Sequence, residues 1–286
     1  MLSIDPKNIP TGTLHRYLLG AVAPRPIAFA STIDADGNPN LSPFSFFNVF
    51  SANPPILIFS PARRVRDNTT KHTLENAQQT KEVVINVVNY DIVQQMSLSS
   101  SDYPKGTNEF VKAGFTMLPS EKVKPFRVAE SPVQFECKVQ EIVELGNEGG
   151  AGNLILCEVV KMHIDERVLD EHGAIDQYKI DLVARAGGSF YSRAKDGFFE
   201  IPKPLTTLGI GVDKIPSEIR ESTVLTGNDL GMLGNVEQLP SKESVDNFVK
   251  DNPQLMTTNT VKKHTFAKEF LTNNDTESAW KVLLIK

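Results

Sequence analysis

The sequence predicts a mainly β fold, a closed or nearly closed β-barrel in which helices are only short insertions. Six or more strand-like segments fall within roughly the first 190 residues, separated by turns rich in Gly, Pro, Asn and Asp. Long helices do not alternate regularly with these strands, which argues against a doubly wound parallel sheet. The composition, 40% hydrophobic and 23% charged, is that of an ordinary globular protein.

The first half of the barrel is expected between residues 27 and 90. Strands are predicted at 27–33, 39–45 and 56–60. Gly37 gives the DADGN turn after the first strand its backbone freedom. A helix is predicted over 69–80, with Asn68 or Thr69 as its N-cap. Residues 82–90 are apolar on both faces, which predicts a central strand covered on each side.

The second half contains two long alternating segments, PVQFECKVQEIV and NLILCEVVKMHI, joined by the glycine-rich LGNEGGAGN. They predict antiparallel strands at 133–145 and 153–164. These strands carry the chain's two cysteines, Cys137 and Cys157, which the register can bring close together. A disulfide is one alternative, and two reduced, buried thiols are the one we expect in a cytosolic setting. Weaker helical signals lie at 91–98 and 111–115, and residues 178–193 are expected to return to the barrel.

The character of the chain changes after the barrel. We divide it into a barrel domain, residues 1–200, and a C-terminal extension, residues 201–286, that is poorer in strand signals. Within the extension, Pro216 is expected at the first position of a helix. Near the end, Trp280, Leu283 and Leu284 share one helical face, which needs an apolar surface to pack on. We expect the extension to wrap the barrel or a dimer partner and not to be a second catalytic domain.

Several classes of function are disfavoured by composition and motifs. A formal charge of -5 argues against general nucleic-acid binding. The N-terminus lacks the pattern of a secretory signal and no apolar stretch is long enough to span a bilayer, so we expect a cytoplasmic protein without membrane contact. The five histidines show no metal-ligand spacing, and we expect no metal site. The GIG at 209–211 lacks the third glycine of a dinucleotide fingerprint, and the SRAK at 192–195 lacks the companion motifs of penicillin-recognising enzymes.

One short stretch, NLSPFSFFNVFSANPPILIFS, is neither a uniform core strand nor an ordinary loop. It places four phenylalanines between Phe44 and Phe50 and intersperses Ser42, Ser45, Asn48 and Ser51. Rings alternating with small polar groups are typical of a surface that holds a flat molecule and hydrogen-bonds its edges. At least two of the four rings are expected to belong to the core instead.

This stretch, with PRPIAFASTIDADGNPN before it and KHTLEN, EVVINVV, VAESPVQFECKV and LVARAGGSFYSRA after it, resembles the flavin reductase-like family of FMN-binding split β-barrels. The segments follow in order over roughly residues 20–195, and the extension lies outside the resemblance. The resemblance implies a homodimer that binds FMN, or FAD, at the dimer interface. NADH or NADPH reduces the flavin as co-substrate.

The resemblance also implies a set of cofactor-binding residues. Ser45, Phe46, Phe47 and Asn48 would border the isoalloxazine ring. Around the phosphate we expect hydroxyls and cations: Ser31, Thr32, Ser60, Arg63, Lys71 and Thr73. Relatives commonly show Lys-Asp-Thr where this chain has Lys71-His72-Thr73. Many also place a histidine on the nicotinamide side, where this chain offers Arg185 and Tyr191.

The function implied is that of an FMN-dependent NAD(P)H oxidoreductase. Hydride would pass from nicotinamide C4 to flavin N5, with no side chain as a covalent catalyst, and electrons would go on to a second acceptor. A flavin carrier without NAD(P)H turnover is one alternative, and a module that recruits a partner oxygenase through residues 201–286 is another. We further hypothesise that this extension narrows access to the flavin; a purely stabilising wrap is the competing interpretation.

Overall fold

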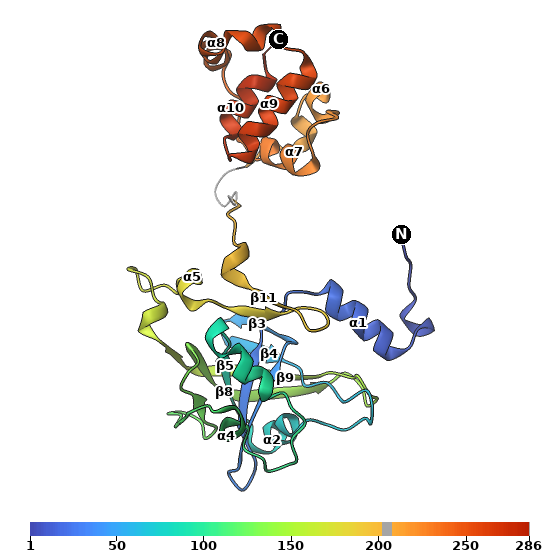
Figure 1. Cartoon of the computed structure of the whole chain (residues 1–286), viewed down its shortest axis with the longest axis vertical. Coiled ribbons are helices and arrows are strands. Elements are labelled where there is room, and N and C mark those ends of the chain that lie inside the picture. The colour runs from blue at the N-terminus through green and yellow to red at the C-terminus, as the bar shows by residue number, and fades with distance from the viewer. Residues whose placement is uncertain (202–207, 286) are drawn as a thin grey trace. The chain divides into compact units, whose positions relative to one another are not determined.

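The computed structural model of the chain describes residues 1–201 and 208–285. It divides into two compact units, Met1–Phe198 and Phe199–Lys286 (Figure 1). The first unit holds all the strands that the structure describes, and the second is helical. Each unit has its own hydrophobic core. The two are therefore described separately.

The first unit is built on a seven-stranded antiparallel sheet in the order β2-β1-β5-β8-β9-β4-β3. The bounds are β1 (Ala28–Ile33), β2 (Pro39–Phe44), β3 (Phe47–Ala52), β4 (Pro55–Phe59), β5 (Glu82–Val87), β8 (Val133–Glu144) and β9 (Asn153–Ile164). The six strands predicted between residues 27 and 164 are thus confirmed, and the mainly β fold with them. The edge strand β3 was not predicted, because its exposed aromatic residues do not follow a period of two.

The two edges of this sheet meet at one end, and this is where the barrel is split. Strands β2 and β3 lie at opposite edges of the sheet, yet only Ser45 and Phe46 separate them in the sequence. The three steps of the chain from Phe44 to Phe47 span at most about 11 Å, so the edges must approach each other there. The residues between the strands therefore lie at the mouth of the split.

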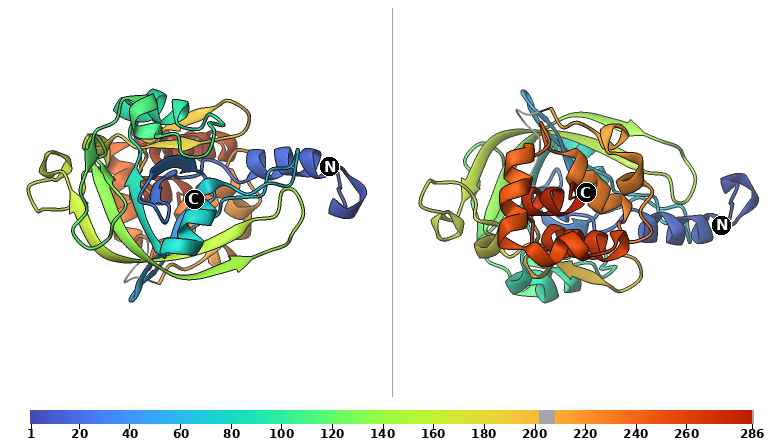
Figure 2. Two further views of the ribbon diagram at one scale, coloured as in Figure 1. Left: turned by 90° about the horizontal axis from the view of Figure 1, so that it is seen from below. Right: turned by 90° about the horizontal axis from the view of Figure 1, so that it is seen from above.

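The barrel interior is closed by a helix, α2 (His72–Thr80), seen among the curved strands in the left view of Figure 2. Its Leu74 and Ala77 join the interior cluster, which includes Phe59, Ile85 and Ile155 from the strands. The helix begins later than predicted. Its N-cap is Lys71 rather than Asn68 or Thr69, because the preceding residues form a separate loop, described below.

The two cysteines lie in the same interior. Both are free and fully buried, and they sit in adjacent register positions, Cys137 opposite Val159 and Cys157 opposite Val139. The neighbouring Cys157 thiol and burial raise the pKa of the Cys137 thiol. The expected pair of reduced, buried thiols is what the structure contains.

The outer face of β1 and β5 is covered by short helices. These are η2 (Tyr90–Ile92), α3 (Val93–Leu98) and α4 (Glu109–Ala113). Met96 and Phe110 from them pack on Phe29 and Val88. The helical signals at 91–98 and 111–115 are thus confirmed, the second with a shift of two residues towards the N-terminus. A short pair, β6 (Met117–Leu118) and β7 (Arg127–Val128), follows.

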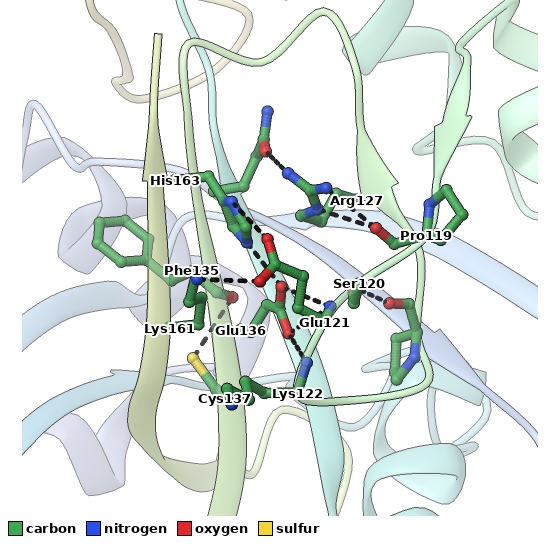
Figure 3. Close-up of polar contacts among 12 residues, drawn as sticks. Pro119, Ser120, Glu121, Lys122, Arg127, Phe135, Glu136, Cys137, Lys161 and His163 are labelled. Carbon is green, nitrogen blue, oxygen red and sulfur yellow. Dashed lines mark hydrogen bonds and ion pairs between the residues drawn. The ribbon is translucent and has the colours of Figure 1, made fainter.

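A buried carboxylate fastens the loop between β6 and β7 to the sheet (Figure 3). Glu136 is completely buried and accepts the backbone N–H of Glu121 at 3.0 and 3.1 Å and that of Lys122 at 2.5 Å. His163 Nε2 lies 2.7 Å from the same carboxylate. Burial opposes ionisation, but these hydrogen bonds outweigh it and lower the pKa of Glu136. The network is structural and lies on β8 and β9.

Residues 178–193 return to the barrel, as predicted, but as a separate hairpin and not as strands of its main sheet. They contain the end of α5 (Gln177–Ile180) and a separate hairpin of β10 (Val183–Arg185) and β11 (Tyr191–Arg193). Isolated bridges, Arg25 to Arg185 and Asn89 to Leu182, tie this hairpin to the barrel. Gly187 and Gly188 lie in the turn of the hairpin, between β10 and β11. The 3-10 turns of this unit are η1 (Pro6–Asn8), η3 (Glu166–Val168) and η4 (Ala194–Gly197).

An unpredicted helix, α1 (Thr11–Ala21), precedes the barrel and reaches outward from it in Figures 1 and 2. None of its residues is buried. Its Tyr17 and Leu18 are about half exposed, at 48% and 51%. A helix with apolar residues exposed in this way has a surface available for a partner.

The second unit is a small helical bundle with a core around Trp280, Leu233 and Leu271. Its elements are η5 (Val212–Lys214), α6 (Ser217–Arg220), α7 (Gly227–Gly234), α8 (Lys242–Asp251), η6 (Pro253–Thr257), α9 (Thr260–Thr272) and α10 (Thr276–Leu283). Pro216 is the N-cap of α6 and not its first residue. The apolar face of Trp280, Leu283 and Leu284 packs inside this core. Its need for an apolar surface is therefore met within the unit.

Candidate functional site

The sequence-predicted residue Thr73 lies at the centre of a buried polar cluster at the start of α2. Its Oγ1 accepts a hydrogen bond from Asn40 Nδ2 at 2.9 Å. The same Asn40 amide donates to Thr32 Oγ1 at 3.2 Å, and Asn76 Nδ2 donates to that oxygen at 3.1 Å. The structure thus brings Thr32 and Thr73 together. Both hydroxyls accept these bonds, so each keeps its own proton to donate elsewhere.

The N-terminus of α2 has free donors beside this cluster. Its N-cap, Lys71, provides no side-chain cap, and its carbonyl accepts only the N–H groups of Leu74 and Glu75. Within the part of the chain that the structure describes, the N–H groups of His72 and Thr73 have no protein partner. Burial, and then the nearby Arg64, lower the pKa of Lys71. A site where a half-buried ammonium adjoins unsatisfied N–H groups favours an anion.

Ser31 and Ser60, predicted with this group, lie apart from it. Successive strand residues face opposite sides of a sheet, so Ser31 points away from the face of Thr32. Its Oγ is buried and has no partner in the described structure. Ser60 Oγ accepts the backbone N–H of Asn153 at 3.0 Å, at the start of β9. The structure does not connect either hydroxyl with Thr73.

Arg63 belongs to the hydrogen-bonded loop, residues 61–70, that precedes α2. Its Nε donates to Asn68 Oδ1 at 2.7 Å and its Nη2 to the Asn68 carbonyl at 2.8 Å. Asn68 has a left-handed backbone, with φ of 59°. The glycine-rich turn between β8 and β9 packs closely on this loop, since a Cβ at Gly149 would lie 3.1 Å from the Arg64 carbonyl oxygen. A side chain at this position would be tightly packed against the loop, and glycine avoids that crowding.

The other predicted group lies at the mouth of the split. Phe47 packs partly on the interior core, whereas Phe46 is 38% exposed and forms an edge contact with His15 of α1. On β3, Asn48 is exposed, and Phe50 is the extra residue of a bulge and 64% exposed. Of the four rings, Phe44 is buried in the core and Phe47 packs partly against it, whereas Phe46 and Phe50 are exposed.

Arg25 is a buried cation beside Ser45 that the sequence analysis did not include in the site. Only 6% of the residue is exposed. Its Nε donates to Ser45 Oγ at 3.5 Å, and Nη1 donates to the carbonyls of Leu19, at 2.7 Å, and Val22 at the end of α1. Its acceptors in the described structure are all uncharged. Burial, and then repulsion from Arg185, lower the pKa of Arg25.

Arg185 and Tyr191 face each other across the hairpin that borders Arg25. Their backbones pair in register, and the Arg185 guanidinium lies 4.7 Å from the Tyr191 ring centre. Arg185 Nη1 also donates to the Phe190 carbonyl at 3.1 Å. Because the Arg25 and Arg185 backbones exchange two hydrogen bonds, of 2.9 and 2.8 Å, the hairpin and the split share one positively charged edge.

The hairpin is anchored by Asp181, which precedes β10. Its carboxylate accepts Arg193 at 2.6 and 2.8 Å and pairs with Lys195 at 2.8 Å. The hydrogen bond from Arg193 is the main reason that the pKa of Asp181 falls to about 2. The Arg193 guanidinium also lies 3.8 Å from the centre of the Tyr90 ring.

Replacing Asp181 with asparagine should therefore destabilise the barrel unit in a pH-dependent way. At pH 7 we expect a loss of roughly 1–2 kcal/mol in the free energy of unfolding, after allowing for solvent screening. The folded pKa is lowered, so this stability is complete above the unfolded value of about 4 and is lost as the pH falls towards 2. Urea unfolding at pH 7 and at pH 3.5 measures the difference in the free energy of unfolding between this variant and the wild type. Asp36→Asn, at an exposed turn, is the control, and a difference independent of pH would contradict the assignment.

The residues that sequence reasoning missed are Arg25, Asn40 and Asn76. A signal existed for the first, because Arg25 interrupts an apolar stretch at the start of a core strand. Asn40 and Asn76 gave no such signal, since their hydrogen-bond partners lie 8, 33 and 44 residues away in the sequence. Within residues 1–201 and 208–285, no group of three metal-binding side chains comes together, and no helix is both long and apolar enough to cross a membrane.

A family model, the flavin reductase like domain, matches residues 20–181 of this chain. The chain belongs to the flavin reductase-like family. An uncharacterised protein of Aquifex aeolicus is 38% identical over 64% of this chain and 90% of its own length. Another, BH2278 of Halalkalibacterium halodurans, is 35% identical over 69% and 94%.

Solved structures agree with this assignment. Nitrilotriacetate monooxygenase component B from Bacillus cereus is 27% identical, with a TM-score of 0.65 over 71% of this chain and 98% of its own. The 2-nitrobenzoate 2-nitroreductase NbaA of Pseudomonas fluorescens is 26% identical, with a TM-score of 0.63 over 73% of this chain and all of its own. The fold is thus the split barrel of flavin reductases, as predicted, and the family supports a flavin-linked oxidoreductase.

Proposed function

We propose that the protein is an FMN-dependent oxidoreductase that oxidises NAD(P)H and passes the electrons to a second acceptor. The observation that carries the proposal is the path of strand β2, which runs from the polar cluster at Thr73 to the split of the barrel. Asn40 binds Thr73, and Ser42 lines the same cavity as Lys71 and Thr73. The strand then leads to Ser45 at the split, roughly 15 Å further on. One strand therefore connects an anion site with an aromatic edge.

The residues present fit a flavin mononucleotide. Lys71, Thr73 and the free N–H groups of α2 would hold its phosphate. Ser45, Phe46 and Asn48 would border the ring, the phenylalanine by apolar contact and the others by hydrogen bonds. When bound, the flavin supplies two-electron chemistry, as an acceptor of hydride from NAD(P)H.

The protein's own contribution is electrostatic and positional. Arg25 and Arg185 form a positive edge without a carboxylate partner in the described structure, and they would stabilise negative charge that develops at the ring. Arg25 is fixed in place by the carbonyls at the end of α1 and by Ser45, so it needs little rearrangement. Arg185 and Tyr191 would border the nicotinamide, in the position that the resemblance gives to histidine.

We further propose a homodimer. Phe46, Val49 and Phe50 are exposed on the edge strand and its lead-in, the last two by more than 60%, and α1 adds Tyr17 and Leu18. Exposed apolar residues on an unpaired strand edge are typical of an interface. Light scattering should give twice the chain mass of 31.6 kDa. A flavin-loaded monomer at dilute concentration would contradict the dimer.

Absorbance and turnover test the function. The purified protein should carry noncovalent flavin or bind added FMN at micromolar concentration, and it should oxidise NADH or NADPH. Protein that binds neither FMN nor FAD would refute the proposal. Flavin binding without NAD(P)H oxidation would support a carrier instead. The similarity to a monooxygenase component makes a partner oxygenase one candidate for the second acceptor.

A further inference from the structure

A buried acid, Glu109, lines the cavity that contains Lys71 and Thr73 and has no role in the function proposed above. Glu109 is the first residue of α4, and only 6% of it is exposed. Its Oε2 accepts the backbone N–H of Leu41 at 3.0 Å, on the free edge of β2. The residue before Leu41 is Asn40, whose amide binds Thr73. The carboxyl group of Glu109 therefore borders the candidate phosphate site.

No cation in the described structure neutralises this carboxylate. Only backbone N–H groups, those of Leu41 and of Glu109 itself, stabilise its charge. Burial outweighs them and raises the pKa of Glu109. A charge is not needed to accept the N–H of Leu41, since a neutral amide would accept it without the cost of burying an ion. The contact with β2 therefore does not explain why this residue is an acid.

The other titratable groups of the cavity come from the start of α2 and from the loops beside it. They are Arg64, Lys71, His72, Asp102 and Tyr103. Asp102 already pairs with Arg64 at 2.6 Å. The elements on which α4 mainly packs, β2 and α3, carry no titratable residue. On α4 itself Lys112 is exposed and lies 5.7 Å from the centre of the Tyr103 ring. Among the described residues, Glu109 is thus the acid of this cavity that has no cation beside it.

A bound phosphate would change the balance of charge at this carboxyl group. A phosphate monoester loses its second proton with a pKa of about 6, so it is mostly a dianion above neutral pH. A dianion and a carboxylate repel each other in a buried site, whereas one proton held between them makes a charge-assisted hydrogen bond. The ammonium of Lys71 and the N–H groups at the start of α2 only donate, so they bind the other phosphate oxygens.

From this geometry we propose that Glu109 and the phosphate bound beside Lys71 share one proton, so that binding of a phosphate monoester takes up a proton from solvent. The inference rests on the proposed function and adds to it a control of flavin retention by pH. FMN is held at lower pH and released as the pH rises. Where neither the empty site nor the free ligand carries the proton, the affinity should fall about tenfold for each unit of pH.

The test is calorimetric titration of the full chain with FMN between pH 6 and pH 9, in pairs of buffers whose enthalpies of ionisation differ. The difference between the two buffers counts the protons that binding takes up. For the wild type the count should approach about one proton for each FMN at the upper end of this range. For Glu109→Gln it should be about zero, because the amide accepts from Leu41 and donates to the phosphate without titrating. Riboflavin, which lacks the phosphate, should take up about none with either protein.

Two further variants serve as controls. Glu130 also accepts a backbone N–H, that of Thr116 at 3.0 Å, but it does not line the cavity, so Glu130→Gln should behave as the wild type. His72→Gln removes the imidazole of the cavity and should keep the proton uptake. Loss of the uptake in His72→Gln, or its persistence in Glu109→Gln, would overturn the proposal. A merely structural Glu109 would give the second result, with a lower Tm for the variant and an unchanged proton count.

Failure of this inference can be told apart from failure of the proposed function. FMN that binds without proton uptake would refute the shared proton and leave the function standing. Wild-type protein that binds no flavin would refute the function. In that case the same titration with ribose 5-phosphate, another phosphate monoester, still decides the matter. Proton uptake that Glu109→Gln abolishes would support the shared proton, and absence of binding or of proton uptake would refute it.

Discussion

Replacing Trp280 with alanine should unfold the helical unit, or nearly so, while the barrel unit stays folded and loaded with flavin. The indole is completely buried, and its Nε1 donates to the Leu233 carbonyl at 3.0 Å. Truncating a buried tryptophan costs about 3–5 kcal/mol, out of the 5–15 kcal/mol that typically stabilises a folded domain. Thermal unfolding is followed by far-UV circular dichroism together with flavin fluorescence. The variant should show a lower Tm for the helical unit and an unchanged Tm for the flavin-loaded barrel unit.

The matched control is Trp280→Phe, which keeps most of the packing and loses the hydrogen bond, at a cost of about 1 kcal/mol. Trp280→Ala also tests the hypothesis that residues 201–286 narrow access to the flavin. That hypothesis began from an apolar stripe in need of a surface, and the stripe is packed within its own unit. We therefore expect the reduction of large artificial acceptors to be unchanged. Faster, less selective reduction by Trp280→Ala would favour access control.

The predictable parts of the fold are those in which the local pattern and the packing agree. The alternating segments around Cys137 and Cys157 become β8 and β9 because each presents one apolar face to the barrel interior. The edge strand β3 was missed for the opposite reason. Its Val49 and Phe50 are apolar yet exposed, and a bulge breaks their alternation. In the homodimer that we propose, such residues would lie in the interface, which a single chain's pattern does not reveal.

The candidate site could be predicted only where its residues occupy a local sequence pattern. Lys71 and Thr73 are set by their position at the start of a helix, which a sequence motif can encode. Asn40 is tied to Thr73 only through the tertiary fold, over 33 residues, and no spacing rule finds it. Grouping Ser31 with Thr32 overlooked the alternation of a strand, which sends neighbouring side chains to opposite faces.

The anion site leads to the second large effect, on flavin affinity. The double variant Lys71→Gln/Thr73→Val should bind FMN about a hundredfold more weakly, since each charge-assisted hydrogen bond lost from a partly buried site costs about 1.5–3 kcal/mol and the two losses are not fully additive. Riboflavin, which lacks the phosphate, should be bound about as well as by the wild type. Titration with both flavins measures the ratio.

The structure supplies a control on the same helix. Thr80, in the last turn of α2, donates its hydroxyl to the Asn76 carbonyl at 2.9 Å, so Thr80→Val removes a comparable group far from the helix N-terminus. It should leave both affinities unchanged. Loss of Thr73 Oγ1 still leaves the Asn40 amide its bond to Thr32, so the fold of the cluster should persist. Thr73→Ser should restore most of the FMN affinity that Thr73→Val removes. An equal loss for FMN and riboflavin would mean that Lys71 and Thr73 support the fold and do not bind the phosphate.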